Sequence, residues 1–344
     1  MQATRPNFIG TASHPALVML NILLVKTSSM GDLVHNCPVV TDILAHYPDA
    51  GIDWVAEEAY VPIPSLHPGV RRVIPIAWRR WRKHLLEGAT WREMGEFRRQ
   101  LQESAYDFVL DTQGLLKSVA VARLARLAPG GVIVGGDRES IKEPLTARFY
   151  DRRLPIGWSR HVVDRCRAVA AGALGYSLDA PPRYNISAAP LEASWLPQDT
   201  SYAVLMHAAS RPPKLWPEAD WIAVGQQLAV HGIRAVFPWG SAEEKQRSER
   251  LAQALPGSVV PPLMDLSVAA RFLAGARVVV GLDTGFTHFA AALGRPTIGI
   301  FCDSDGEQAA VFGDAYCASF GKKGAPPDRP TILAALEQAL VSPL

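Results

Sequence analysis

Short apolar runs alternate with longer amphipathic stretches along the first half of the chain. The runs have the length and the branched side chains of buried strands, and the stretch 91–104 has the apolar spacing of a helix. This alternation predicts a parallel sheet with helices on both faces. The predicted strands are 21–25, 52–56, 72–76, 108–111 and 132–134.

The second half repeats the alternation more regularly. Pro217 suits the first turn of a helix and Gly232 its end, which bounds one helix at 216–232. We therefore predict an α/β fold with two Rossmann-like, doubly wound domains. Ligands bind outside the carboxyl ends of such strands, so we expect the site in the cleft between the domains. The other predicted elements are helices at 241–255, 266–276, from Thr284 and at 330–340, and strands at 201–208, 233–240, 277–283 and 296–301.

The length of 344 residues also fits two domains. We place the first domain at 19–183 and the second at 184–344, with the linker in the Pro- and Ala-rich stretch 180–195. The last predicted helix is amphipathic and suits packing on either domain. Residues 1–18 carry no periodic pattern, and we expect either a disordered extension or a natural start at Met19.

Composition narrows the class of protein. Hydrophobic residues make up 48% of the chain and charged residues 20%, as in ordinary globular proteins, and a net charge of +2 gives no bulk attraction for nucleic acid. The four cysteines form no Cys-x-x-Cys pair, which is typical of a reduced cytoplasmic protein. No apolar run reaches the roughly 18 residues of a membrane-spanning helix, and the N-terminus lacks the apolar core of a signal peptide.

The stretch 278–296 reads as a buried strand, a turn and a helix. At the turn, Asp283, Thr284 and Gly285 precede a helix whose free N–H groups attract anions, and Gly285 allows a close approach. His288 lies on the same helix face as Thr284. The pattern indicates a phosphate or diphosphate site, or else a capped helix with a packed histidine.

A second polar turn, KTSSMGD at 26–32, follows the first strand. It lacks both the glycine fingerprint of nicotinamide-binding proteins and the P-loop pattern. Asp32 is either a helix cap or a general base in the cleft, and the cap is the safer interpretation of the residues alone. Pro38 predicts either a kinked helix or a helix that starts near Asn36.

Three further stretches carry candidate chemistry. Lys214, in a loop after a strand, either offsets diphosphate charge or is a solvated surface lysine. Glu243 or Glu244 either binds ribose hydroxyls or favours a helix dipole. The segment 71–83 holds six Arg or Lys and no acid, with Trp78 and Trp81 among them. It is either a solvated face or a surface for an anionic acceptor, an acidic membrane or single-stranded nucleic acid; without an RNA motif, an anionic amphiphile fits better.

Five stretches together resemble glycosyltransferase family 9, the heptosyltransferases of lipopolysaccharide synthesis. They are ILLVKTSSMGD, DTQGLLKS, HAASRPPKLWPEADW, PWG and DTGFTHFAAALGRP, in family order over about residues 19–340. KTSSMGD points to heptosyltransferase I rather than II. The resemblance implies a GT-B fold, in which two Rossmann-like domains face each other across a cleft.

The resemblance also implies an activity. It is the inverting transfer of L-glycero-D-manno-heptose from ADP-heptose to the first Kdo of Kdo2-lipid A, in the lipopolysaccharide inner core of Gram-negative bacteria. No metal and no cofactor take part. The enzyme is expected to be a monomer, peripheral on the cytoplasmic face of the inner membrane, with no nucleic acid partner. The alternatives are heptosyltransferase II or III, with a heptose acceptor, and a non-catalytic nucleotide-sugar binding protein.

By resemblance, Asp32 is the catalytic base and Lys214 offsets the leaving charge. The sequence departs from the family at Ala209, at Pro212 and Pro213, and in the loop FCDSDGEQ after the last strand. The implied donor-binding residues are Ser210, Lys214, Glu244, Met264, Asp283, Thr284, Gly285 and His288, and the implied acceptor-binding residues are Arg79, Arg80, Arg82, Lys83, Gln113 and Lys117.

Overall fold

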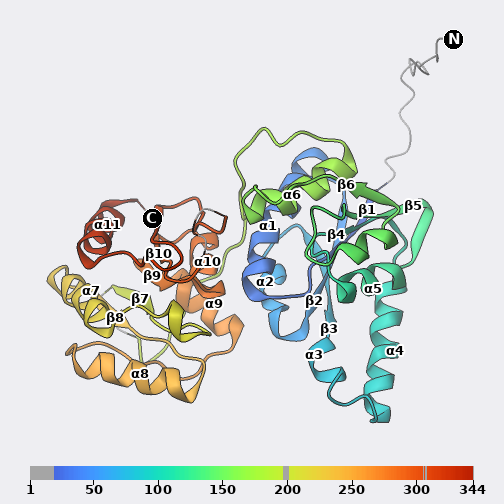
Figure 1. Cartoon of the computed structure of the whole chain (residues 1–344). Helices are drawn as coiled ribbons and strands as arrows, with labels where there is room; N and C mark the ends of the chain where they lie inside the picture. Colours follow the sequence, from blue (N-terminus) through green and yellow to red (C-terminus); the bar gives the residue numbers. More distant parts are fainter. Residues whose placement is uncertain (1–18, 197–200, 305, 307, 344) are drawn as a thin grey trace.

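The computed structural model describes residues 19–196, 201–304, 306 and 308–343, so the expectation for residues 1–18 lies outside the described residues. The chain forms two lobes that lie side by side, the first coloured blue to green and the second yellow to red in Figure 1. Each lobe contains its own parallel sheet. The predicted α/β fold with two doubly wound domains is confirmed.

The first lobe contains a six-stranded sheet in the order β3-β2-β1-β4-β5-β6. Its central strand β1 is almost wholly buried, as expected where helices cover both faces. Val25 at the end of β1 lies opposite Asp111 at the end of β4, so the loops that follow leave the sheet next to each other. The strands are β1 (Asn21–Val25), β2 (Gly51–Glu57), β3 (Val70–Ile76), β4 (Tyr106–Asp111), β5 (Leu127–Gly136) and β6 (Arg152–Leu154). The helices are α1 (Met30–His46), η1 (Glu58–Tyr60), α2 (Pro62–Ser65), α3 (Trp78–Trp81), α4 (Gly88–Gln102), α5 (Leu116–Leu124), η2 (Pro144–Phe149) and α6 (Val162–Leu174).

The second lobe contains a five-stranded sheet in the order β11-β10-β9-β7-β8. The ends of β7, β9 and β10 are in register, so the loops after Met206, Leu282 and Ile300 lie at one edge. The strands are β7 (Tyr202–Met206), β8 (Arg234–Val236), β9 (Val278–Leu282), β10 (Thr297–Ile300) and β11 (Cys317–Phe320). The helices are η3 (Pro212–Lys214), α7 (Glu218–Val230), α8 (Ala242–Gln253), α9 (Leu266–Ala274), α10 (Gly285–Ala292) and α11 (Arg329–Val341).

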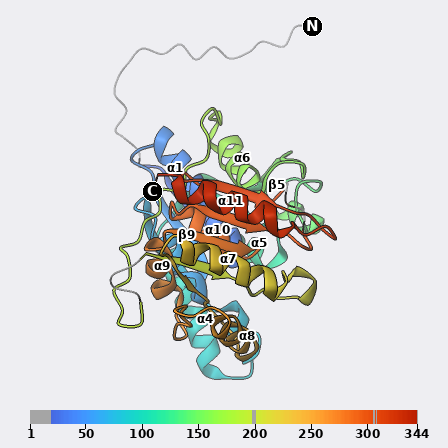
Figure 2. The same ribbon diagram turned by 90° about the vertical axis from the view of Figure 1, so that its left-hand side faces the viewer.

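Helix α11 packs within the second lobe. It lies beside α7 on the outer side of the sheet, where Figure 2 shows the red and yellow helices next to each other, and it also contacts β10 and β11. Of the two placements open from the sequence, the structure has the one on the second domain. The described part of the predicted linker, 180–195, contains no helix or strand.

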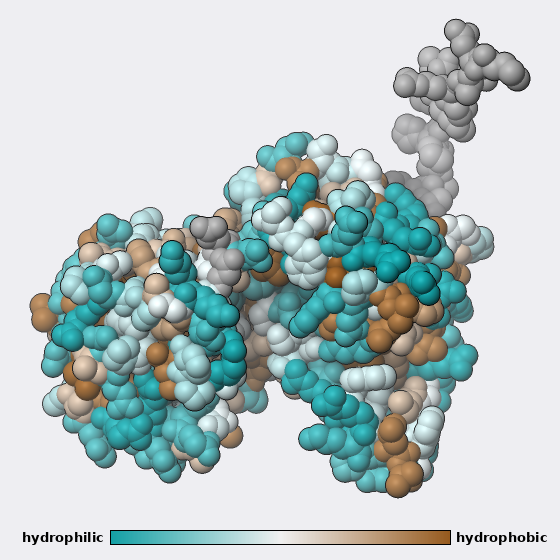
Figure 3. All heavy atoms as spheres, viewed as in Figure 1, coloured by the Kyte–Doolittle hydropathy of each residue, from teal (hydrophilic) through white to brown (hydrophobic). Residues whose placement is uncertain are grey.

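The lobes meet through helices α1 and α10. One hydrophobic cluster runs through both lobes and includes Val34 of α1, Leu273 of α9 and Phe289 of α10. At the start of these helices the backbones are close, since a Cβ on Gly285 would lie 3.0 Å from the backbone nitrogen of Gly31. Beside this contact the surface is hollowed between the lobes, as Figure 3 shows.

Candidate active site

A cavity of about 330 Å³ opens at the carboxyl edge of the first sheet. The loop after β1 supplies Lys26 and Ser29, and the loop after β4 supplies Gln113. Helix α6 covers the cavity with Arg165 and Cys166. The register of β1 and β4 brings the two loops together, as the rule for ligand sites in such sheets predicts.

Asp32 lies on this cavity in the first turn of α1, and it also caps the helix. Its Oδ2 accepts hydrogen bonds from the N–H of Ser29 (2.8 Å) and from the Ser29 hydroxyl (3.1 Å). Its Oδ1 lies 3.9 Å from Nζ of Lys26. The side chain is 40% exposed, so one carboxylate oxygen remains open to a ligand. Cap and cavity group are thus one residue, and α1 starts at Met30 with Pro38 inside it rather than near Asn36.

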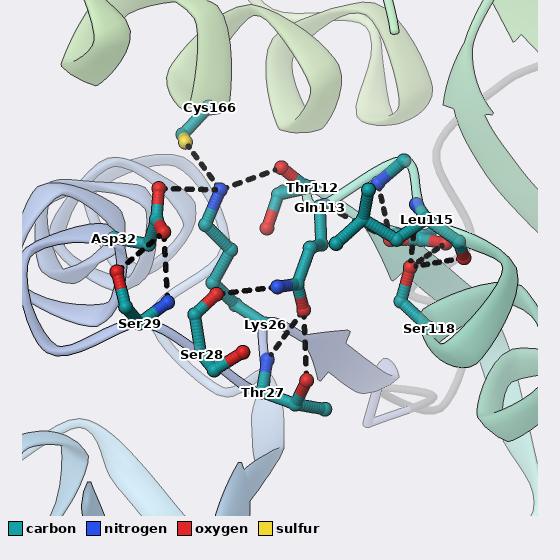
Figure 4. Close-up of polar contacts among 12 residues, drawn as sticks. Lys26, Thr27, Ser28, Ser29, Asp32, Thr112, Gln113, Leu115, Ser118 and Cys166 are labelled. Carbon is teal, nitrogen blue, oxygen red and sulfur yellow. Dashed lines mark hydrogen bonds and ion pairs between the residues drawn. The ribbon is translucent and has the colours of Figure 1, made fainter. Parts of the chain in front are cut away.

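Lys26 is a buried cation that sequence reasoning did not single out. Figure 4 shows its ammonium between Asp32, Thr112 and Cys166. It donates to the carbonyl of Thr112 (2.9 Å) and to Sγ of Cys166 (3.7 Å). Burial raises the pKa of the Cys166 thiol, so the thiol is neutral and the carboxylate of Asp32 is the anion beside Lys26. Its position directly after a buried strand was the one available signal.

Gln113 and Lys117, predicted to bind the acceptor, hold the loop that carries Asp32. The Oε1 atom of Gln113 accepts from the N–H (2.8 Å) and the hydroxyl (2.9 Å) of Thr27, and its amide nitrogen donates to the carbonyl of Ser28. Lys117 donates to the Ser28 hydroxyl. Gln113 also lines the cavity. Both residues therefore hold the loop between β1 and α1 in place through Thr27 and Ser28.

The loop after β4 is itself fixed by Asp111, which is buried. Its carboxylate accepts from the N–H groups of Gln113 (2.9 Å) and Gly114 (3.1 Å) and from the hydroxyls of Ser118 (2.8 Å) and Tyr150 (2.8 Å). Burial raises the pKa of Asp111, while these four donors favour its ionised form. Asp111 is fully occupied in this network, which leaves Asp32 as the carboxylate in the cavity with an open oxygen.

On the second lobe, Asp283 contacts two other predicted donor-binding residues, Lys214 and His288. Its Oδ2 accepts from Nζ of Lys214 (2.8 Å), and its Oδ1 lies 3.4 Å from Nε2 of His288. Burial alone would raise the pKa of Asp283, but the hydrogen bonds from His288 and Lys214 outweigh it and hold the pKa well below its usual range. Thr284 precedes Gly285 at the start of α10, where the N–H of Thr287 already donates to the carbonyl of Thr284 (3.1 Å), while the N–H groups of Gly285 and Phe286 have no partner inside the helix. The structure therefore brings Lys214, Asp283, Thr284, Gly285 and His288 together.

The other predicted donor residues surround the same sheet edge, outside the lining of the first-lobe cavity. Glu244 is half-buried in the first turn of α8, and its Oε2 accepts from the N–H of Gly240 (2.7 Å). Glu243 is exposed and accepts a hydrogen bond from the Ser241 hydroxyl, so Glu244 is the less exposed of the two carboxylates at this helix start. Met264 is partly buried just before α9, and Ser210 is exposed in the loop that leads to Lys214.

Three of the six cations in the basic segment 71–83 form ion pairs within the protein. Arg71 and Arg72 pair with the buried Asp53, both at 2.9 Å. Arg80 pairs with Glu58 (2.9 Å) and Glu93 (2.8 Å).

What remains free is a smaller basic group. Arg79 bonds the Tyr60 hydroxyl (3.0 Å), while no carboxylate of the described residues pairs with Arg82 or Lys83. Arg79, Arg80 and Lys83 line a second cavity of about 300 Å³. Trp81 is buried and donates to Glu93, so only Trp78 is exposed there. Among the described residues, Arg79, Arg82 and Lys83 are thus the cations of the segment that form no side-chain ion pair, although Glu57 and Glu58 line the same cavity as Arg79 and Lys83.

Across residues 19–196, 201–304, 306 and 308–343, no group of three or more His, Cys, Asp or Glu side chains is arranged to hold a metal ion. The four cysteines are free thiols. None of the described helices is both long enough and apolar enough to span a bilayer.

Comparison with known proteins gives relatives that are named heptosyltransferases. The chain is 43% identical over 288 residues to lipopolysaccharide heptosyltransferase 1 of Escherichia coli K12, which covers 83% of this chain and 89% of that protein. It is 41% identical over 283 residues to lipopolysaccharide heptosyltransferase 1 of Pseudomonas aeruginosa, covering 82% and 78%. Relatives named heptosyltransferase 2, from Haemophilus influenzae and Salmonella typhimurium, are 23% and 26% identical.

The fold agrees with a solved structure of the same kind. The E. coli heptosyltransferase WaaC with ADP superposes with a TM-score of 0.83 at 38% identity, covering 93% of this chain and 100% of that one. The sequence profile of glycosyltransferase family 9 (heptosyltransferase) matches residues 94–329. These findings confirm the resemblance and the GT-B architecture that it implied. The chain belongs to glycosyltransferase family 9, the heptosyltransferases.

Proposed function

We propose that this chain transfers L-glycero-D-manno-heptose from ADP-heptose to the first Kdo of Kdo2-lipid A, with inversion at the anomeric carbon. The observation that carries the proposal is its 41–43% identity, over most of the chain, to proteins named lipopolysaccharide heptosyltransferase 1. Relatives named heptosyltransferase 2 are more distant, at 23–26% identity, which favours a Kdo acceptor over a heptose acceptor. A structure of the E. coli relative contains ADP-2-deoxy-2-fluoro heptose, which supports ADP-heptose as the donor.

Asp32 is the proposed general base. Its Oδ2 is held by Ser29, and its Oδ1 takes the proton from the acceptor hydroxyl. The hydroxyl oxygen forms a bond to the anomeric carbon of the heptose while the bond from that carbon to the ADP oxygen breaks. The electron pair of the broken bond leaves with ADP.

The second lobe is the proposed site of the donor. The N–H groups of Gly285 and Phe286 and the ammonium of Lys214 stabilise the charge that develops on the leaving diphosphate. Asp283 and His288 orient Lys214 and the helix start. These groups supply the positive charge that a metal ion provides in other glycosyltransferases, so we propose that the transfer needs no metal.

Three further residues complete the proposed donor site. Glu244 accepts hydrogen bonds from ribose hydroxyls, because its carboxylate is partly buried and bound at the start of α8. Met264 covers one side of the adenine, and the exposed Ser210 hydroxyl lies on the phosphate side, before Lys214. Both lobes of one chain supply the site, so we propose that the enzyme acts as a monomer.

The acceptor lipid places the proposed enzyme at a membrane surface. Helix α3, helix α4 and the segment between them expose four large apolar side chains: Trp78 (36%) of α3, Leu85 (47%) and Leu86 (102%) of the joining segment, and Trp91 (61%) of α4. Figure 3 shows apolar side chains at the lower end of the first lobe, where Figure 1 places this segment. Apolar side chains next to unpaired basic ones suit a peripheral contact with an anionic membrane. We propose this contact on the cytoplasmic face of the inner membrane, with Arg79, Arg82 and Lys83 on acceptor or lipid phosphates.

The test is ADP release from ADP-heptose and Kdo2-lipid A by the wild-type protein, Asp32→Asn and the control Asp49→Asn. We expect turnover by the wild type and the control, and a loss of about 10²–10⁴-fold in kcat for Asp32→Asn, with ADP affinity unchanged by calorimetry. A wild-type protein that binds ADP without turnover would contradict the acceptor assignment. Full activity of Asp32→Asn would contradict the role of Asp32 as the base.

A further inference from the structure

Arg211 and Asp303 form an ion pair between two loops at the carboxyl edge of the second sheet. Nη2 of Arg211 lies 3.1 Å from Oδ2 of Asp303. Arg211 is in the loop after β7, just before η3, and Asp303 is in the loop after β10. Neither residue is among the donor-binding or acceptor-binding residues that the family resemblance implies.

The ion pair spans the start of the proposed donor site. In the second sheet β9 lies between β10 and β7 (Figure 1), and the carboxyl ends of the three strands are in register. Neighbouring strands are about 4.8 Å apart, so the loops after β7 and β10 begin about 10 Å apart, with the loop after β9 between them. A pair that joins the two outer loops therefore bridges residues 283–284, directly before α10.

The backbone that carries the pair is held on both sides. The N–H of Lys214 donates to the carbonyl of Arg211 (3.0 Å), and two prolines restrict the backbone between these residues. On the other loop, the carbonyl of Cys302 accepts from the N–H of Gly324 (3.0 Å). The side chain of Arg211 is nevertheless 60% exposed, whereas that of Asp303 is 18% exposed. The guanidinium is therefore the part of the pair that is free to turn.

The charges of the protein at this edge balance one another. Lys214 pairs with Asp283 (2.8 Å), and Arg211 pairs with Asp303 (3.1 Å). The diphosphate of a nucleotide sugar brings further negative charge, and a diphosphate site needs cations to offset it. One of the two pairs must therefore release its cation to the ligand.

The pair of Arg211 separates at the lower cost. Lys214 and Asp283 are both mostly buried, and Asp283 also contacts His288. An exposed ion pair contributes little to stability, because water solvates both of its groups. A guanidinium binds phosphate oxygens through charge-assisted and often bidentate hydrogen bonds. Arg211 is thus the cation that a diphosphate can take over.

We propose that Arg211 is a further donor-binding residue, which pairs with Asp303 until the donor binds and then exchanges that carboxylate for the diphosphate of ADP-heptose. The inference rests on the proposed function, in which ADP-heptose occupies the second lobe. Asp303 lies in the stretch FCDSDGEQ, where the sequence departs from the family. The carboxylate that competes with the donor for Arg211 is therefore a feature of this chain.

The experiment is calorimetry of ADP binding, which needs no acceptor. It compares the wild type, Arg211→Gln, Arg211→Lys, Asp303→Asn and the double variant Arg211→Gln/Asp303→Asn. The control is Arg234→Gln, which changes an exposed arginine at the start of β8, on the opposite edge of the sheet. Adenosine is titrated in parallel, because it has the nucleoside but no phosphate.

For Arg211→Gln we expect the Kd for ADP to rise about 10- to 100-fold, the range of a hydrogen bond to a charged group. Arg211→Lys should lose less, and the control should bind as the wild type does. Asp303→Asn should bind ADP at least as tightly as the wild type, because no carboxylate then competes for the guanidinium. Adding Arg211→Gln to Asp303→Asn should still weaken ADP binding. Adenosine should bind equally to every variant.

Three results would contradict the exchange of partners. If Asp303→Asn weakens ADP binding, the ion pair persists in the bound state. If the loss from Arg211→Gln disappears in the Asp303→Asn background, Arg211 only neutralises Asp303 and does not bind the diphosphate. If adenosine shows the same loss, the substitution disturbs the nucleoside site.

Failure of the proposed function is seen separately. A wild-type protein that binds ADP but does not turn over Kdo2-lipid A contradicts the acceptor alone, and the ADP titrations still decide the role of Arg211. A wild-type protein that does not bind ADP overturns the inference together with the donor.

Discussion

At the scale of single residues, Asp32 closes a capping box and also lines the cavity, so the cap and the proposed base are not alternatives. One carboxylate oxygen closes the first turn of α1 with Ser29, and the other faces the cavity. The cap orients the carboxylate, so the proposed base needs no separate support. Removing the residue therefore has a structural effect as well as a chemical one.

Substitution can separate these two effects. Asp32→Ala removes the cap and should lower the free energy of unfolding by about 1 kcal/mol. Asp32→Asn keeps an oxygen for the N–H of Ser29 and should leave stability within about 0.5 kcal/mol of the wild type. Both variants should lose transfer activity. Urea unfolding followed by far-UV circular dichroism measures the difference, and equal destabilisation of the two variants would rule out the cap as the cause.

The sequence could predict that several candidate site residues lie together, because polar residues after buried strands lie at one edge of a sheet. Asp32, Lys214 and Asp283 all follow strands in this way. Arg165 and Trp158 also line the cavity, but this rule could not predict them, because a lone arginine on an amphipathic helix resembles a surface residue. Only the packing of α6 over the first sheet brings Arg165 to a loop more than a hundred residues earlier.

Charge partners were equally hidden from the sequence. Arg80 is bound by Glu58 and Glu93, which come from a different turn and a different helix. Since its guanidinium already pairs with two carboxylates, we expect Arg80 to contribute less to acceptor binding than the run of basic residues indicated. These partners could not be predicted from the sequence, because only the fold brings η1 and α4 next to α3.

At the scale of elements, the strands of both sheets were predicted with shifts of a few residues, and two edge strands were missed. β6 is only three residues long and mostly exposed, and β11 is only partly buried. Neither has the continuous apolar run by which buried strands are recognised. β8 is shorter than predicted and ends at Val236, just before Pro238, which has no N–H to donate to a sheet.

The segment between α3 and α4 gives an element-scale prediction. Leu86→Asp together with Lys83→Glu should weaken cosedimentation with vesicles that contain anionic lipid, because both the apolar and the electrostatic contributions are lost. We expect at least a 10-fold loss in partitioning at about 0.1 M salt. The matched control is Arg98→Glu, which reverses an exposed charge on α4 away from the segment between α3 and α4. Unchanged binding of the double variant to anionic vesicles would overturn the proposed membrane contact.

At the scale of the whole molecule, buried histidines make the fold sensitive to acid. Burial lowers the pKa of His67 and of His207 to about 4, and it lowers the pKa of His35 well below its usual range. His35 faces His288 and His161, with Lys26 and Asp283 also nearby, and its Nε2 has no hydrogen-bond partner. All three residues are therefore neutral in the folded protein at pH 7.

This predicts a loss of stability on mild acidification. Below a pH of about 6.5 the unfolded chain binds protons that the folded chain does not, so the free energy of unfolding falls by up to ~1.4 kcal/mol per pH unit for each histidine. The loss should be seen between pH 6.5 and pH 4.5, as a lower urea midpoint at pH 5 than at pH 7.5. His67→Gln should reduce the slope. Identical midpoints at the two pH values would show that the histidines titrate normally.

The close approach of Gly31 and Gly285 has a consequence for how the lobes come together. The backbone nitrogen of Gly31 and the side chain of Met30 both lie 3.0 Å from the place that a Cβ on Gly285 would take, so the contact leaves no room for a side chain at position 285. The contact between Gly31 and Gly285 lies between the proposed base and the proposed leaving group, where a displacement of about 1 Å in the reacting groups is enough to slow a transfer. A methyl group at position 285 would push the lobes apart, since its carbon would lie 3.0 Å from the Gly31 nitrogen and from the Met30 side chain. A methyl group at position 31 would fit, with its carbon 3.5 Å from Cα of Gly285. A glycine at position 285 thus allows the two lobes to approach this closely beside the proposed reaction site.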